Sequence, residues 1–414
     1  MGRILNRTRS LRRAVWTCAL VLLVLATPAA RATDWQLSVD ARLIDSDGQR
    51  SFLDGGLGTL RFGDNQSGLR LGRARLALDQ PIGQILALKV DASAWGDHDK
   101  SPVGLTEAYL ELRPYPLAGW RVRVKAGAFY APISLENTAP GWESPYTVAF
   151  SALDSWVAEE LRTIGLETRI EWLGTHLGYD FDAALIGSVF GWNEPAGVGL
   201  ATHGFAFDDR QTTLFGRVGL PFAVPVGGVQ EFREIDGRAG IYGGVELRYL
   251  DRVLVRALHY DNQANPSAFD PILGAHAWET RFDTVGIRAE LPGGWTGIYQ
   301  WLEGETYVSP IGVEYQWAFN TSYALLSKRI GKHTLSARLD AFSVSPAAST
   351  PFGTQTGHAG SVAYVYQHDT HLRITLEWLR VRSYESNRML FLGESPFATE
   401  SAVTLAVRYA IGTP

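Results

Sequence analysis

The stretch GWRVRVKAGAFY, residues 119 to 130, alternates cations with small and apolar side chains. Arg121, Arg123 and Lys125 occupy every second position, and tryptophan, valine and alanine fill the positions between them. Successive side chains of a β-strand point to opposite faces, so this pattern predicts a strand with one charged face and one apolar face. A strand of this kind needs a different solvent on each side.

Segments of about ten residues with the same alternation recur along the chain, separated by turns or loops. Clear examples are WQLSVDARL (35–43), ILALKVDASA (85–94), EAYLELR (107–113), TIGLETRIEW (163–172) and AVTLAVRY (402–409). A phase change in LRLGRARLAL (69–78) predicts a β-bulge at residues 72–75. Helical periodicity is nearly absent, and residues 156–162 form at most a short helix inside a loop.

The connections are of two kinds, terse turns such as LPGG and IGK and long loops such as 131–160 and 191–238. Short turns on one side and long loops on the other are typical of an outer-membrane barrel. A soluble β-sandwich would explain one two-faced strand, but it gives no reason for this sorting. A cation on a lipid-facing wall costs about 2–4 kcal/mol at the midplane, so the cationic faces are expected to line the interior.

The predicted fold class is therefore all-β, a transmembrane antiparallel β-barrel with short periplasmic turns and long external loops. Strand counting gives 16 strands if residues 191–238 form one large external loop. Eighteen strands are possible if TTLFGRVGL (212–220) and VQEFREI (229–235) are strands as well. An odd number is disfavoured because both chain ends of such a barrel lie on the periplasmic side.

The amino terminus has the pattern of a secretory signal peptide. Five arginines in residues 1–13 precede an apolar run, and Ala30-Arg31-Ala32 offers small residues for cleavage. Residues 1–32 are therefore expected to be removed, leaving the barrel in residues 33–414. A membrane anchor is the alternative, but the run is shorter than the roughly 20 residues needed to span a bilayer. The single cysteine, Cys18, lies within this peptide, so the exported chain gains no stability from disulfides.

The predicted barrel is wide enough to hold a water-filled channel. The apolar and aromatic 131–160 segment directly follows the most basic strand and is expected to fold inward as a constriction loop; an ordinary exposed loop is the alternative. The inward phase gives these channel-lining candidates: Lys89, Glu107, Glu111, Arg113, Arg121, Arg123, Lys125, Glu167 and Arg169. Further inward-phase candidates include Arg248, Arg338, Asp340, Arg373, Glu377 and Arg408. The cations favour anions, whereas the mixture of signs equally fits pairs that stiffen the wall.

No motif for catalysis, metal binding or a cofactor appears in the sequence. There is no Gly-x-Ser-x-Gly, no His-Glu-x-x-His and no Gly-rich phosphate loop with a lysine. The chain is already acidic, with 38 basic and 43 acidic residues, and loss of the arginine-rich leader makes it more so. This balance argues against nucleic acid as a partner.

Residues 67–190 resemble the phosphate-selective porin O and P family. The resemblance lies in LRLGRARLAL, in EAYLELRPYPLAGWRVRVKAGAFYAPISLENTAPGW and in ALDSWVAEELRTIGLE. It implies a sixteen-stranded outer-membrane channel, often trimeric, whose third external loop folds inward. Anion or phosphate preference is a further implication.

The resulting hypothesis is an outer-membrane porin for passive diffusion of small hydrophilic solutes, with anions preferred. Its expected partners are the bilayer, those solutes and two further copies in a homotrimer. A non-conducting barrel with a structural or surface-binding role is the alternative, and a barrel hydrolase is a third possibility.

Overall fold

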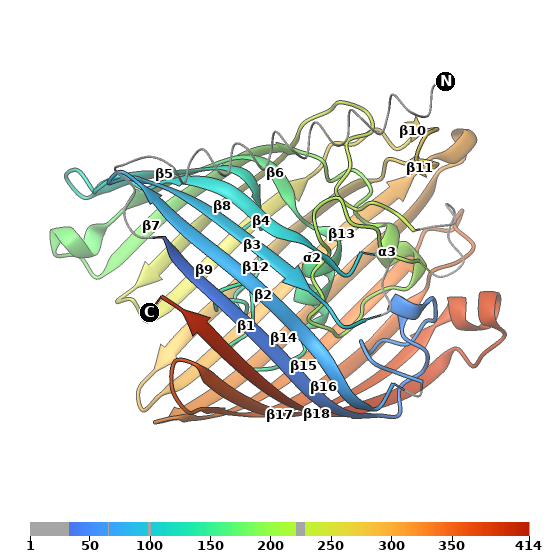
Figure 1. The fold of residues 1–414 in the computed structure, drawn as a ribbon. Helices are drawn as coiled ribbons and strands as arrows, with labels where there is room; N and C mark the ends of the chain where they lie inside the picture. The colour runs from blue at the N-terminus through green and yellow to red at the C-terminus, as the bar shows by residue number, and fades with distance from the viewer. Residues whose placement is uncertain (1–32, 65, 98–100, 221–227, 414) are drawn as a thin grey trace, which may run out of the picture.

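Sixteen antiparallel strands close into a single barrel in the computed structural model, which describes residues 33–64, 66–97, 101–220 and 228–413 (Figure 1). The barrel strands are β1 (Asp34–Ser46), β2 (Gly68–Ile82), β3 (Leu86–Ala94), β4 (Val103–Leu112), β5 (Trp120–Phe129), β6 (Thr163–Trp172), β7 (Phe181–Gly191), β8 (Gly240–Tyr249), β9 (Val253–Asp261), β12 (Glu279–Leu291), β13 (Trp295–Val308), β14 (Tyr315–Ile330), β15 (His333–Pro346), β16 (Gln355–Gln367), β17 (Leu372–Glu385) and β18 (Phe397–Gly412). The predicted signal peptide lies outside the described residues.

Each strand pairs with its neighbours in sequence, and β1 closes the ring against β18 from Gln36–Gly412 to Ser46–Ala402. Closure pairs every strand on both sides, which a sheet in a bilayer requires. The eighteen-strand alternative is wrong: among the described residues of 212–220 and 229–235, pairing is limited to one isolated bridge, Val218–Val229. The extra labels β10 (Phe269–Asp270) and β11 (Ala275–His276) belong to a small hairpin within a loop.

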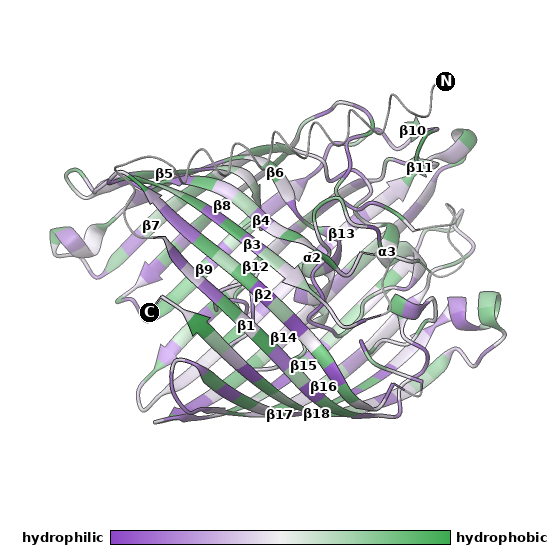
Figure 2. Ribbon diagram, viewed as in Figure 1, coloured by the Kyte–Doolittle hydropathy of each residue, from purple (hydrophilic) through white to green (hydrophobic). Residues whose placement is uncertain are grey.

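The wall has two faces, as the alternation predicts. Polar and apolar residues alternate along the strands in Figure 2, and exposure alternates with them. In β15 the outward Leu339 is 70% exposed, whereas the adjacent inward Arg338 is 1% exposed. Trp120 and Val122 of the opening stretch are exposed on the outside in the same way. The chain is thus a transmembrane β-barrel with an apolar outer surface and a polar inner one.

A dry aromatic core fills part of the barrel interior. Helix α2 (Ala152–Glu160) lies against inward side chains of β12 and β14, and its Trp156 ring centroid is 5.3 Å from Phe282 and 5.0 Å from Phe319. Helix α3 (Val198–Thr202) is buried as well. Short 3-10 turns lie at Phe52–Asp54, Gly174–Leu177 and Pro310–Gly312, and a π-helical turn lies at Arg388–Leu392. Among the described residues, no helix has the length and apolar character to cross a bilayer.

Candidate functional site

The three cations of the opening stretch point into the barrel and each contacts a carboxylate. Their closest pairs are Arg121–Glu171 at 2.5 Å, Arg123–Glu111, and Lys125–Glu167 at 3.2 Å. Glu171 and Glu167 lie on β6 directly across the ladder from Arg121 and Lys125, and Glu111 lies on β4 diagonally across from Arg123. Opposite charges on facing strands attract, and this cross-strand pairing holds the side chains against the wall.

The charged row continues around one half of the inner wall in both directions. On one side Lys89 of β3 contacts Asp79 of β2 at 2.9 Å. On the other side Arg169 of β6 contacts Glu246 of β8 at 2.5 Å, and Arg256 of β9 contacts the same carboxylate at 2.7 Å. Charges of alternating sign therefore run from β2 to β9, which is the arrangement of a stiffened mixed wall.

Two of the candidate residues have different surroundings. Glu107 of β4 accepts a hydrogen bond from the backbone N–H of Tyr130 at 3.1 Å, so it positions the chain where it leaves β5. Arg113 lies beyond the end of β4, in the short turn to β5, and its side chain is exposed. Its backbone N–H donates to the carbonyl of Ile85 at 2.6 Å, across the same end of the barrel.

Residues 131–160 lie inside the barrel, held by polar side chains of the opposite wall. Arg338 of β15 donates to the carbonyls of Ala149 and Phe150 at 2.9 and 2.8 Å, and it forms ion pairs with Glu136 at 3.2 Å and Asp340 at 2.9 Å. Further anchors are Glu377, which accepts from the N–H groups of Val148 and Ala149, and Gln300, which bonds Leu135 and Ile133. The inward charges of β15 and β17 thus satisfy the backbone of this segment.

A second inward segment, residues 193–214, was missed by the sequence analysis, which described 191–238 only as a large external loop. Nearly all of its side chains are buried. It bonds the barrel through Phe205 N–H to Gln355 at 2.7 Å, and it bonds the first segment through Ser155 Oγ to the carbonyl of Asp208 at 3.0 Å. The signal in the sequence was GVGLATHGFAFDD (197–209), whose apolar residues have no reason to face water.

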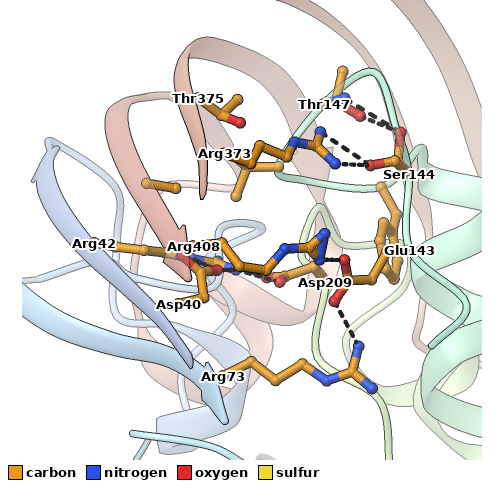
Figure 3. Close-up of a pocket in the computed structure, with 13 residues that line it drawn as sticks. Asp40, Arg42, Arg73, Glu143, Ser144, Thr147, Asp209, Arg373, Thr375 and Arg408 are labelled. Carbon is orange, nitrogen blue, oxygen red and sulfur yellow. Dashed lines mark hydrogen bonds and ion pairs between the residues drawn. The ribbon is translucent and has the colours of Figure 1, made fainter. Parts of the chain in front are cut away.

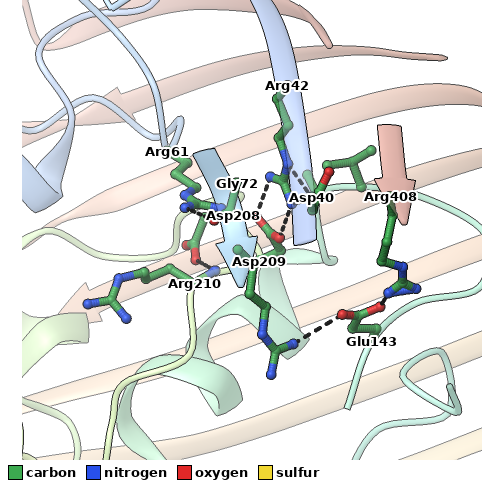
Figure 4. A network of polar contacts seen from close by, with 12 residues as sticks. Asp40, Arg42, Arg61, Gly72, Glu143, Asp208, Asp209, Arg210 and Arg408 are labelled. Carbon is green, nitrogen blue, oxygen red and sulfur yellow. Dashed lines mark hydrogen bonds and ion pairs between the residues drawn. The ribbon is translucent and has the colours of Figure 1, made fainter. Parts of the chain in front are cut away.

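An arginine cluster, defined here as Arg42, Arg61, Arg73, Arg75, Arg373 and Arg408, lies where both inward segments meet the wall of β1, β2, β17 and β18 (Figures 3 and 4). Arg42 and Arg61 contact the second segment, and Arg373 and Arg408 contact the first. Arg42 lies between Asp40 and Asp209, with nitrogen–oxygen distances of 2.8 Å to each. Arg61 contacts Asp209 at 2.7 Å. Although burial opposes it, these two guanidinium groups hold the pKa of Asp209 well below its usual range.

The bulge predicted in LRLGRARLAL shapes this cluster. Asp40 pairs with Arg73 while Ala41 pairs with Leu71, so Gly72 is the extra residue of β2. A Cβ at Gly72 would lie 2.3 Å from Nε of Arg42, and the Gly72 carbonyl accepts from Arg61 at 2.7 Å. Because Gly72 has no side chain, the Arg42 guanidinium can lie beside Asp209.

Several cavities follow the wall at the cluster. One of about 50 Å³ is lined by four members of the cluster and by Asp40, Glu143 and Asp209 (Figure 3). A larger one of about 480 Å³ is lined by Arg75, Lys89, Glu107 and Tyr109 from the wall, and by residues 138–141 of the inward segment. Arg373 differs from the other lining arginines, because its guanidinium bonds the Ser144 carbonyl at 3.3 and 3.4 Å and has no carboxylate within ion-pair distance in the described part of the chain.

The chain matches no protein-family model and no curated protein sequence. Its fold is similar to that of the outer membrane channel DcaP of Acinetobacter baumannii, at 11% identity and TM-score 0.53 over 92% of this chain and 96% of that one.

Two further solved structures have a similar fold. OmpT, an outer membrane protein of Vibrio cholerae, is 9% identical with TM-score 0.53 over 94% and 99% of the two chains. The anion-selective porin from Comamonas acidovorans is 12% identical with TM-score 0.51 over 92% and 99%. At these identities the likeness concerns architecture alone, and the fold of this chain is that of an outer-membrane porin barrel.

Proposed function

We propose that this protein is an outer-membrane porin through which small hydrophilic solutes diffuse passively. One observation carries the proposal: the charged row from β2 to β9 lines the inner wall with side chains that keep partial solvent exposure, such as Lys89 at 36% and Arg123 at 25%. Ionised groups that face a barrel interior favour water there, and water supports the passage of polar solutes. In this proposal residues 131–160 act as the constriction loop.

A modest preference for anions is the finer part of the proposal. The small cavity at the arginine cluster is lined by four arginines and three carboxylates, so its formal charge is positive. Arg373 contributes a charge with no carboxylate at ion-pair distance among the described residues. A positive constriction lowers the barrier for anions relative to cations. One solved structure of similar fold is an anion-selective porin, which agrees with this direction.

Export and assembly complete the proposal. Residues 1–32 would be cleaved as the signal peptide, and the barrel would insert in the outer membrane as a homotrimer. The OmpT protein of Vibrio cholerae, which has a similar fold, has been solved in a trimer form.

Conductance in a planar bilayer tests the channel. Purified protein is expected to produce discrete steps in 1 M KCl, and the reversal potential in a KCl gradient is expected to indicate anions as the more permeant ions. Absence of steps from protein whose folded state is verified by circular dichroism would contradict the porin proposal. Steps with cation preference would contradict only its finer part.

A non-conducting barrel is the second candidate function, because two segments occupy the interior instead of one. Residues 131–160 and 193–214 bond each other and the wall, and this packing could close the lumen. The same bilayer experiment separates the two candidates, since a closed barrel gives no steps.

A further inference from the structure

Three carboxylates meet where the 191–238 connection leaves and rejoins the barrel. Glu194 follows the end of β7 by three residues, and Glu234 and Asp236 precede the start of β8. One carboxylate oxygen from each of the three lies within 4.8 Å of the others. Residues 40 positions apart in sequence are thus brought to one point by the fold.

Backbone amides hold these carboxylates in place. Glu194 Oε2 accepts from the N–H groups of Ile235 at 2.5 Å and Asp236 at 2.9 Å, and Glu234 Oε2 accepts from Trp192 N–H at 3.0 Å. Asp236 in turn accepts from the N–H groups of Arg238, at 2.7 Å to Oδ1, and of Asn265, to Oδ2. A set of carboxylates fixed by amides on two loop ends is pre-organised for a ligand.

Glu194 Oε1 is the atom of this cluster that indicates a bound ligand. Glu194 is only 2% exposed, and in the ionised carboxylate its Oε1 is buried without a hydrogen-bond donor in the described residues. Leaving a buried carboxylate oxygen unpaired costs free energy, so such an atom calls for a neutralising partner. It lies beside Glu234, whose charge makes the deficit larger.

The protein's own cations compensate this charge only in part. The Arg238 guanidinium is 3.9 Å from Asp236 and 58% exposed, and Arg233 is directed to Asp270 at 3.8 Å. The remaining means of neutralisation are a proton or a bound cation.

We propose that Glu194, Glu234 and Asp236 bind a calcium ion that ties the two ends of the 191–238 connection together. Oxygen ligands suit hard cations, and Ca²⁺–oxygen distances of about 2.3–2.6 Å fit oxygens up to 4.8 Å apart around one centre. Ca²⁺ also tolerates the irregular geometry of carboxylates that come from two loop ends, whereas Mg²⁺ requires near-ideal octahedral geometry. Partial exposure of Glu234 leaves room for water as the remaining ligands.

The role of the ion follows from where the site lies. Glu194 comes directly after Asn193, which bonds the carbonyl of Glu160 in the first inward segment at 2.6 Å and accepts from Tyr260 of the wall at 2.6 Å. A cation at Glu194 would therefore fix the entrance of the second inward segment against the exit at Asp236. This function is separate from conductance and does not depend on it.

Terbium luminescence tests the site on the purified full-length barrel in detergent. Tb³⁺ takes the same oxygen ligands as Ca²⁺ and emits when a nearby tryptophan is excited, and Trp192 is joined to Glu234 through its backbone. We expect a saturable signal that added Ca²⁺ displaces. The double variant Glu194→Gln, Asp236→Asn keeps an acceptor oxygen at each position and is expected to bind Tb³⁺ at least tenfold more weakly.

The matched control is Glu314→Gln, Glu394→Gln, which removes two exposed carboxylates from other loops and is expected to bind as the unmodified chain does. Heat-dependent migration in electrophoresis reports whether each barrel is folded. If the double variant does not fold, Glu234→Gln, at a partly exposed position, takes its place. Any of three results would overturn the proposal: no saturable signal, a signal that millimolar Ca²⁺ does not displace, or an equal loss of binding in the control. The neutralising role would then be assigned to a proton.

Discussion

Arginine residues inside the barrel differ in their partners. Some pair with carboxylates of the wall itself, and others bond the two inward segments. Arg121 and Arg123 pair with carboxylates of adjacent strands and keep part of their surface in water. Arg338 and Arg42 are buried and bond residues of the two inward segments. A charge buried with several partners is costly to strip of them, whereas a partly exposed pair contributes little. Substitutions should therefore have strong effects on stability only in the second group.

Ion preference is best tested by substitution of Arg373. A unit charge about 8 Å from a passing ion contributes roughly 0.5 kcal/mol in water, favourable for an anion and unfavourable for a cation, so it changes the anion-to-cation ratio by about 1 kcal/mol, or about fivefold, at low salt. Arg373→Gln is accordingly expected to lower the anion-to-cation ratio by up to about fivefold in dilute KCl, measured as a shift of reversal potential. Arg113→Gln, which removes an exposed charge from a short turn, is the control and should leave the potential unchanged. Equal shifts in both variants would contradict a local effect at the arginine cluster.

Gly72 makes a second residue-scale prediction. Its substitution by alanine places a Cβ 2.3 Å from Nε of Arg42, so the guanidinium must move away from Asp209. Overpacking of this kind costs about 1–3 kcal/mol, and the loss of urea resistance in lipid vesicles measures it. Gly187→Ala is the matched control, because no atom lies within 4 Å of a Cβ there. Similar losses in both variants would show that the cost comes from adding a methyl group to any strand glycine, and not from the contact with Arg42.

At the scale of elements, the first inward segment depends on one buried ion cluster. Arg338→Met leaves Glu136 and Asp340 buried without their cation, at a cost of about 3–5 kcal/mol. We expect the segment to detach, with faster proteolysis within 131–160 and with larger, noisier conductance steps. The triple variant Arg338→Met, Glu136→Gln, Asp340→Asn removes the unpaired charges and should recover part of the stability. Arg380→Gln, an outward arginine of β17, is the control, and an effect as large as that of Arg338→Met would contradict the anchoring role.

The contact between the two inward segments is expected to weaken as pH rises. Burial and then the charge of Glu159 raise the pKa of Glu160 to about 7, so the folded chain keeps a proton that the unfolded chain releases near pH 4.5. Glu159 also raises the pKa of His203 although burial opposes it, and their 3.0 Å pair is lost with rising pH. Both effects have the same sign, and the buried Asp208 and Glu231, whose pKa values are raised mainly by burial, add to it.

Unfolding in urea between pH 5 and pH 8 measures this dependence. The unmodified chain should lose on the order of 1–3 kcal/mol across the window, and Glu160→Gln should show a shallower slope. Glu314→Gln removes an exposed carboxylate and should keep the full slope. Identical slopes in the unmodified chain and Glu160→Gln would assign the dependence to other groups.

For the whole molecule, the alternation of side chains was sufficient to predict the closed barrel and the bulge beside Gly72, and it gave sixteen strands as one of two possible counts. Alternation determines on which side of a wall Arg121 or Arg338 lies, because that depends on neighbours in the strand. It does not determine what each inward residue meets across the lumen. The contact of Arg42 with Asp209 joins residues 167 positions apart, and periodicity carries no information on such pairs. The second inward segment therefore escaped sequence reasoning.

A row of polar residues marks a boundary on the outer face of the barrel. Five outward residues lie in register on neighbouring strands and are all polar, namely His259, Asp283, Glu303, Asn320 and Ser343. On the side of the short turns, outward positions of the same strands are mostly apolar, as at Leu339 of β15. We interpret this row as the edge of the hydrocarbon layer on this part of the barrel, because charged side chains are tolerated at the interface and not at mid-depth.

Two substitutions in one strand test this boundary and the transmembrane orientation with it. Leu339→Arg places a cation within the apolar band and should cost about 2–4 kcal/mol, whereas Ser343→Arg, four residues nearer the long loops on the same face, should cost about 0–1 kcal/mol. Reversible urea unfolding in vesicles measures both. The two changes introduce the same side chain on the same strand, so their difference reports depth alone. Equal costs would show that the outward face of β15 does not meet hydrocarbon, and the assignment of this wall to a bilayer would fail.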